Sequence, residues 1–277
     1  MKRICFLCLL ISMSWVAQAA DFSIQSEGGG QGYSYQDLWQ HPKAETVSLP
    51  LLNYPGQELS VRVVPARELL KSLAIKDQDR LKFHCLDGYS GFLDPKLLLS
   101  QDPSRSEAYL AIEDPDNPWP PLPKKNNKDK VTAGPYYLVW KEPKKSNIPP
   151  EFWPYQLKGL ELIKGSALPF AKLNPAHGLE AGSPIMQGFQ VYQKRCMQCH
   201  TLNGEGPSTM GPDLNLPMNP TEYFKPAALR KFIKNPASVR EWSDMKMRWV
   251  AENTWSDQDI EVLVAYLEHM ASRKLTN

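Results

Sequence analysis

The sequence has few cysteines, no long apolar run and no strong excess of either charge. Five cysteines in 277 residues are too few for a disulfide framework. The apolar run from Ile4 to about Val16 is shorter than the roughly 20 residues that span a bilayer, and no later segment is longer. A net charge of +2 gives no broad basic surface. We therefore expect neither a membrane span nor a nucleic-acid partner.

The first twenty residues have the pattern of a secretory signal. Lys2 and Arg3 precede the apolar run, and small residues, Ala17 and Ala19, follow it. Cleavage after residue 20 would remove two basic and no acidic residues, so the formal charge would fall from +2 to zero. The sequence thus predicts an exported protein, located in the periplasm.

The remaining chain divides by composition into four parts. Residues 21–45 are glycine-rich and predict a flexible lead-in with one short helix. Residues 46–164 contain short alternating or continuous apolar segments between proline-rich loops, which predicts a mixed α+β domain that is mostly β. Residues 165–184 collect Gly, Pro, Ala and Ser and predict a linker. Residues 185–277 show helical spacing and predict an all-α domain. The expected fold class is therefore multidomain.

Three helices are expected in the last part. Ile185, Phe189 and Tyr192 have helical spacing and lead to a pair of cysteines. A second, short helix is predicted over 225–235. The last helix should begin after Ser256, which has the acidic residue of a capping box three positions later.

Cys196, Cys199 and His200 form the pattern C-x-x-C-H, which is typical of covalent c-type haem attachment. Two thiols one helical turn apart can each add to a vinyl group of one porphyrin, and the next imidazole can bind the iron. A zinc site would need a second pair of ligands, which the sequence lacks. A thioredoxin-like dithiol would open a helix, whereas this pair follows one. The pattern predicts one covalent haem c, held by Cys196 and Cys199 and with His200 on the iron.

The segment from Ile185 to about Arg273 resembles a class I cytochrome c domain. The resemblance is carried by the C-x-x-C-H motif and by Gly188, Phe189, Tyr192, Gly211 to Leu214, and Tyr266. It implies that the first and last helices cross, with Gly188 and Tyr266 at the contact. It also implies that Pro212 packs beside the proximal histidine.

The family's second iron ligand is a methionine on a loop shortly before the last helix. Met247 matches this place, although Arg248 stands where the family has proline, and Met245 is the alternative. Trp249 is expected to pack against the haem. Two earlier methionines lie too far from the last helix to match: Met210 and Met218.

Residues 46–164 are similar to the molybdopterin-binding domain of the sulfite oxidase family. The similarity lies chiefly in FHCLDGYSGFL and in the segment from Ala133 to Ile163. In that family a cysteine at the position of Cys85 binds molybdenum, and a thiolate suits this metal. No set of basic residues for a pterin phosphate is recognisable, so we expect Cys85 to be a core residue and no molybdopterin to bind.

These patterns together predict a periplasmic monohaem cytochrome that carries single electrons to or from a redox protein. We expect an electron-transfer protein rather than an enzyme. Between Thr221 and Arg248, seven basic residues stand against three acidic ones, which fits either an acidic partner or a solvated face. Two alternatives stay open: a haem-containing molybdenum oxidoreductase with the metal at Cys85, and a haem sensor or peroxidase with an open axial position.

Overall fold

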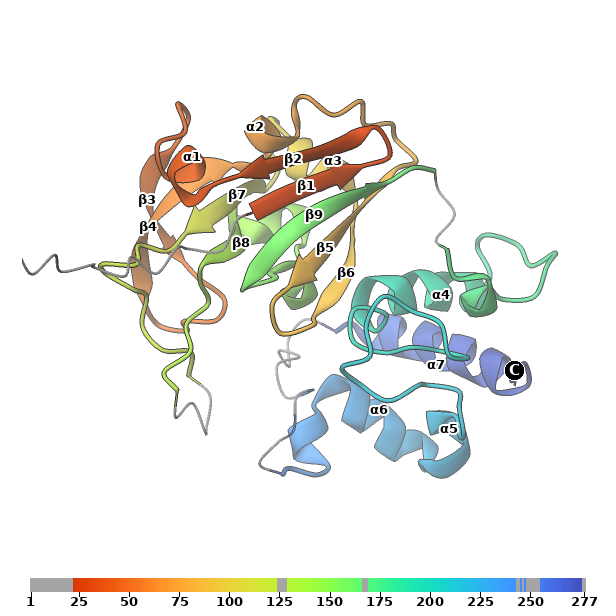
Figure 1. Cartoon of the computed structure of the whole chain (residues 1–277). Helices are drawn as coiled ribbons and strands as arrows, with labels where there is room; N and C mark the ends of the chain where they lie inside the picture. The colour runs from red at the N-terminus through yellow and green to blue at the C-terminus, as the bar shows by residue number, and fades with distance from the viewer. Residues whose placement is uncertain are drawn as a thin grey trace, which may run out of the picture.

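The protein consists of a sheet-rich region followed by a helical region (Figure 1). The computed structural model describes residues 22–123, 129–165, 169–242, 245, 247 and 255–275. Strands end at Ile163, and the helices of the second region begin at Pro184. This order confirms the predicted multidomain organisation, with a mostly β part before an all-α part.

One sheet of the first region has five strands in the order β2-β1-β9-β5-β6. β1 is antiparallel to β2 and parallel to β9, while β5 is antiparallel to both β9 and β6. The bounds are β1 Phe22–Ser26, β2 Gly29–Tyr33, β5 Arg80–Cys85, β6 Ser90–Leu93 and β9 Leu157–Ile163.

The pairing of β1 corrects the expectation of a flexible lead-in over 21–45. Ser23, Ile24 and Gln25 align with Gly159, Leu160 and Glu161 of β9. Phe22 and Ile24 are buried in the core of the region. The glycines that suggested flexibility instead form a tight turn and the edge strand β2, where a small residue is tolerated.

The second sheet has four antiparallel strands in the order β3-β4-β7-β8. Five of the six residues of β7 and five of the six of β8 are buried, as their continuous apolar sequences predict. Both sheets contribute to one hydrophobic core. The bounds are β3 Glu45–Pro50, β4 Glu58–Pro65, β7 Glu107–Ile112 and β8 Tyr136–Lys141.

Short helices connect these strands. α1 begins with a capping box in which Ser34 and Asp37 each accept from the other's backbone N–H. α3 begins after Asp94, with proline at its first position. The bounds are α1 Tyr35–Trp39, α2 Ala66–Leu70, α3 Pro95–Leu99, and the 3-10 turns η1 Pro143–Ser146 and η2 Pro150–Phe152.

The helical region is organised by the crossing of its first and last helices. A Cβ atom at Gly188 would collide with the backbone carbonyl of Val262, so glycine permits the close approach. The last helix begins after Ser256 with the predicted capping box to Asp259. The bounds are α4 Pro184–Arg195, α5 Pro220–Tyr223, α6 Pro226–Lys234, α7 Asp257–Ala271, and the turns η3 Ala171–Leu173 and η4 Pro236–Ser238.

The second half of the predicted linker packs against α7. Leu173 is fully buried, and its carbonyl accepts a hydrogen bond from the hydroxyl of Tyr266 at 2.7 Å. The backbone N–H of Ala176 donates to Nε2 of His269 at 3.0 Å. This segment is therefore part of the helical region.

Candidate functional site

The two cysteines of the motif lie on one turn at the end of α4. Ser183 caps the start of this helix, and Cys196 is its C-cap residue. The backbone N–H groups of Cys199 and His200 both donate to the carbonyl of Cys196, at 3.0 and 2.9 Å. The structure contains Cys196 and Cys199 as thiols and not as a disulfide. The two thiols therefore lie three positions apart on one hydrogen-bonded turn.

The imidazole of His200 is held by the loop that follows the motif. Its Nδ1 lies 2.7 Å from the carbonyl of Pro212, which can only accept, so Nδ1 carries the proton and Nε2 keeps its lone pair. Burial lowers the pKa of His200, with a smaller opposing effect from the Pro212 carbonyl and Asp213. The ring is therefore neutral near pH 7 and can act as a metal ligand.

Gly211 forms a cradle for this imidazole. A Cβ atom at this position would collide with the ring of His200, so only glycine fits. The backbone N–H of Gly211 also donates to the carbonyl of Cys199 at 2.7 Å. The segment Gly211–Pro212 thus fixes both the place and the tautomer of the imidazole. Such a fixed, neutral ring suits the proximal ligand of a haem.

A partly buried polar network around Asp213 anchors the same loop, and the sequence motif does not reveal its hydrogen bonds. The carboxylate of Asp213 accepts from the backbone N–H groups of Asn203, Gly204, Asn215 and Leu216 at 2.7 to 3.2 Å. Burial alone would raise the pKa of Asp213, but these bonds lower it below the ordinary value. The signal available in the sequence was the run of Asn and Asp around the glycines, which is typical of a hydrogen-bonded loop.

Side-chain amides extend this network to α7. Asn215 Nδ2 donates to the carbonyl of Met270 at 2.8 Å and to Oδ1 of Asn203 at 2.8 Å. Asn219 Nδ2 donates to the carbonyl of Leu267 at 3.0 Å. All three amides are buried. The loop beneath the imidazole is thereby tied to the last helix.

Tyr266 lies where the crossing helices meet the motif. Its ring centroid is 5.4 Å from that of Tyr192 and 5.5 Å from that of Phe189. The hydroxyl of Tyr192 donates to the carbonyl of His200 at 3.0 Å. The aromatic cluster therefore links the helix crossing to the candidate iron ligand.

The two candidate methionines differ in exposure. The side chain of Met245 is buried, and that of Met247 is half-buried. Most of their loop, including Trp249, lies outside the described residues. Met218, by contrast, is half exposed on the surface. The axial assignment to Met247 stays a prediction.

Cys85 lies at the end of β5, where the pairing with β9 shifts register. Its side chain is buried in the core, and burial raises the pKa of its thiol. The preceding His84 lies on the other face and contacts Glu161 at 3.1 Å. Within the described ranges no group of three His, Cys, Asp or Glu side chains is placed to hold a metal ion.

The sheet-rich region contacts the C-x-x-C-H motif directly. Oε1 of Gln198, a residue between the two cysteines, accepts from the backbone N–H of Phe92 in β6 at 3.2 Å. Phe92 belongs to the hydrophobic core of the helical region. Arg195 forms an ion pair with Glu151 of the sheet-rich region at 3.3 Å. The motif is therefore covered by residues distant in the sequence.

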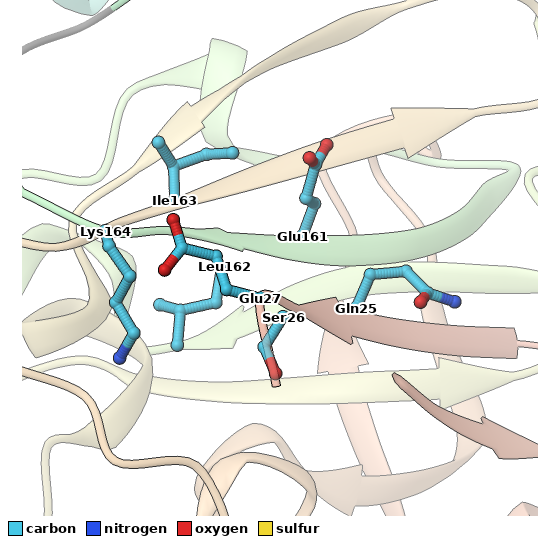
Figure 2. A pocket seen from close by; sticks show the side chains of 7 residues that line it. All are labelled: Gln25, Ser26, Glu27, Glu161, Leu162, Ile163 and Lys164. Atoms are coloured by element: carbon cyan, nitrogen blue, oxygen red, sulfur yellow. The ribbon is translucent and has the colours of Figure 1, made fainter. Parts of the chain in front are cut away.

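A surface hollow lies on the neighbouring strands β1 and β9 (Figure 2). Figure 2 shows side chains of both strands around it, among them Gln25 and Glu161. Neither Cys85 nor any residue of the haem motif lines it. This hollow is thus separate from the candidate site.

Comparison with protein families agrees with this geometry. Residues 185–271, somewhat less than a third of the chain, match the family described as cytochrome c. No curated protein matches the sequence. No helix among the described residues is both long and apolar enough to cross a membrane. The helical region therefore contains a segment similar to cytochrome c.

Proposed function

We propose that the protein is an exported monohaem c-type cytochrome that exchanges single electrons with a redox protein. The observation that carries this proposal is the turn from Cys196 to His200, with the imidazole fixed by the Pro212 carbonyl and the Gly211 cradle. These residues fit a haem, because both thiols lie on one turn and the imidazole presents Nε2. A bound haem would supply an iron that gains and loses one electron.

Each residue has a separate role in this proposal. Cys196 and Cys199 would hold the haem through thioether bonds, and His200 would bind one axial position. Met247 would bind the other, with Met245 as the alternative. Pro212 and Tyr266 would keep the site packed, and Trp249 would cover the haem. The protein groups themselves make and break no substrate bond.

Haem attachment is tested by intact mass and absorbance after expression in cells that attach haem c. The exported protein should gain the mass of one haem, and Cys196→Ala or Cys199→Ala should prevent stable attachment. Cys85→Ala is the matched control, because this third cysteine lies in the other region, and it should retain the haem. A colourless wild-type protein with the mass of the bare polypeptide would refute the proposal.

The sheet-rich region is proposed to be a support domain with the fold of the sulfite oxidase family but without its metal. The similarity around Cys85 and the burial of its thiol support this role. Metal analysis of the purified holoprotein should find iron and no stoichiometric molybdenum. About one molybdenum per haem would establish the oxidoreductase instead.

Export is tested by the removal of the signal sequence. The mature protein should lack residues 1–20, which the mass of the purified chain will show.

The basic excess between Thr221 and Arg248 should make electron transfer faster with an anionic redox reagent than with a cationic one of similar potential. This preference should shrink as salt is added. Equal rates for both reagents at low salt would contradict an acidic partner.

A further inference from the structure

The interface between the two regions lies at the haem-attachment turn. β6 is an edge strand of its sheet, yet all four of its residues are buried. Figure 1 shows the helical region beside β5 and β6. A Cβ atom at Gly91 of β6 would collide with the side chain of Gln198. The C-x-x-C-H turn is therefore fitted against this edge.

The amide of Gln198 completes the hydrogen bonding of the edge strand. It is fully buried, accepts from Phe92 and donates weakly to the carbonyls of Gln193 and Lys194, both at 3.4 Å. The ring of Phe92 packs edge-on against Phe170 at 6.0 Å. An unpaired N–H at a sheet edge is costly when buried, so the contact stabilises the docked arrangement.

A buried pair of opposite charges crosses the same interface. The side chains of Arg195 and Glu151 are only 6% and 10% exposed, and their charged atoms are 3.3 Å apart. The guanidinium of Arg195 also lies 5.0 Å from the ring centroid of Trp255. The backbone carbonyl of Glu151 accepts from the hydroxyl of Tyr89 at 2.9 Å. Both charges are thus held in place and shielded from water.

The fields of both charges reach the sulfur of Cys196. Burial raises the pKa of this thiol; the negative charge of Glu151 raises it further, while Arg195 lowers it. Glu151 itself has a pKa raised by burial, which Arg195 partly offsets. A charge that acts at the attachment sulfur also acts at the porphyrin edge bonded to it, and at low exposure solvent screens it little.

We propose that the sheet-rich region forms one wall of the haem site, and that Glu151 and Arg195 set the reduction potential of the haem by opposed charges. This inference rests on the proposed haem attachment. A negative charge near the haem stabilises the oxidised iron and lowers the potential, whereas a positive charge stabilises the reduced iron and raises it. One partner of the pair comes from each region, so the potential depends on their docking.

The experiment is a redox titration of the full-length haem-loaded protein. Glu151→Gln keeps the shape of the side chain and should shift the potential upward. Arg195→Gln should shift it downward, and the double variant should lie between the two. A purely structural role would instead shift both single variants in the same direction, because loosening the interface admits water in either case.

Controls separate this inference from the proposed function. Glu261→Gln removes a carboxylate from the exposed pair with Arg230, at 2.6 Å within the helical region, and should leave the potential unchanged. Glu151→Asp retains the charge and should stay near the wild-type potential. The inference is overturned if Glu151→Gln and Arg195→Gln shift the reduction potential in the same direction, or if neither shifts it more than the control does. Absence of haem by mass refutes the proposed function instead.

Discussion

Gln198 and Phe92 join the haem-attachment turn to an edge strand through one buried hydrogen bond of 3.2 Å. Gln198 occupies a position that the C-x-x-C-H motif leaves open to any residue. Its identity here is explained by the strand it contacts and not by the cofactor. The motif therefore contributes a docking contact in this chain, beside the haem attachment that we propose for its cysteines.

Replacing Gln198 by alanine should weaken the contact between the two regions. The change leaves the N–H of Phe92 without its partner and opens a cavity, which should lower the free energy of unfolding by about 1–3 kcal/mol. Denaturant unfolding of the holoprotein measures this loss. Gln187→Ala is the matched control, because Gln187 is an exposed glutamine on α4, the helix that precedes the turn of Gln198. Equal stability of the two variants would show that the bond contributes nothing.

Gly188→Ala should disturb the crossing of α4 and α7. The added methyl group would collide with the carbonyl of Val262, which forces the helices apart. Overpacking of this kind costs about 1–3 kcal/mol, and thermal unfolding followed by haem absorbance should detect it. Gly182→Ala, with no atom within 4 Å of the new methyl group, should leave stability unchanged or slightly raised. If Gly188→Ala unfolded at the same temperature as the wild type, the close crossing of the two helices would contribute nothing to stability.

Asp213→Asn tests the loop beneath the imidazole through its dependence on pH. The folded pKa of Asp213 lies below the ordinary value of about 3.9. Its stabilising effect is therefore present above about pH 4 and disappears as the pH falls through the folded pKa. We expect the variant to be less stable than the wild type by about 1–3 kcal/mol at pH 7, with the difference shrinking in acid.

Asp77→Asn is the control for this prediction. The side chain of Asp77 is 88% exposed and forms an ion pair with the exposed Lys96. Unfolding curves at several pH values should show little difference between this variant and the wild type. A difference for Asp213→Asn that is constant across the acid range would contradict a role of its charge.

Met247→Ala should lower the reduction potential while the haem stays attached. A thioether ligand raises the potential of a haem relative to nitrogen ligation, so its loss moves the potential down. Met245→Ala should keep the potential but lose about 2–5 kcal/mol of stability, because a buried side chain leaves a cavity. A lowered potential in Met245→Ala, with an unchanged potential in Met247→Ala, would assign Met245 to the iron.

The features that the sequence predicted correctly depend on residues that are close together in the chain. The capping box at Ser256 and the proline at the start of α6 define helix ends through neighbouring residues alone. The alternation of β5 placed Cys85 in the core and His84 on the opposite face. The pattern for haem attachment is local in the same way, since Cys196, Cys199 and His200 lie within five consecutive residues, and it stays a prediction.

Long-range contacts explain what the sequence did not reveal. The glycines near Ser26 suggested flexibility, yet they form β2, which pairs with β1, and β1 in turn pairs with the distant β9. Glu151 stands in a proline-rich segment that was interpreted as a surface loop, yet its side chain is buried against Arg195. No pattern within either segment identifies its partner, because β1 is buried by a strand far along the chain and Glu151 is buried by the helical region.

The parallel pairing of β1 with β9 affects how the chain folds while it is being made. A chain made from its N-terminus exposes its first strand long before the last strand of that sheet exists. Such non-local closure is slow and leaves an apolar segment open to wrong pairings. Because β6 of this sheet also contacts Gln198 between the two cysteines, the thiols should be most accessible to haem attachment before the sheet has closed.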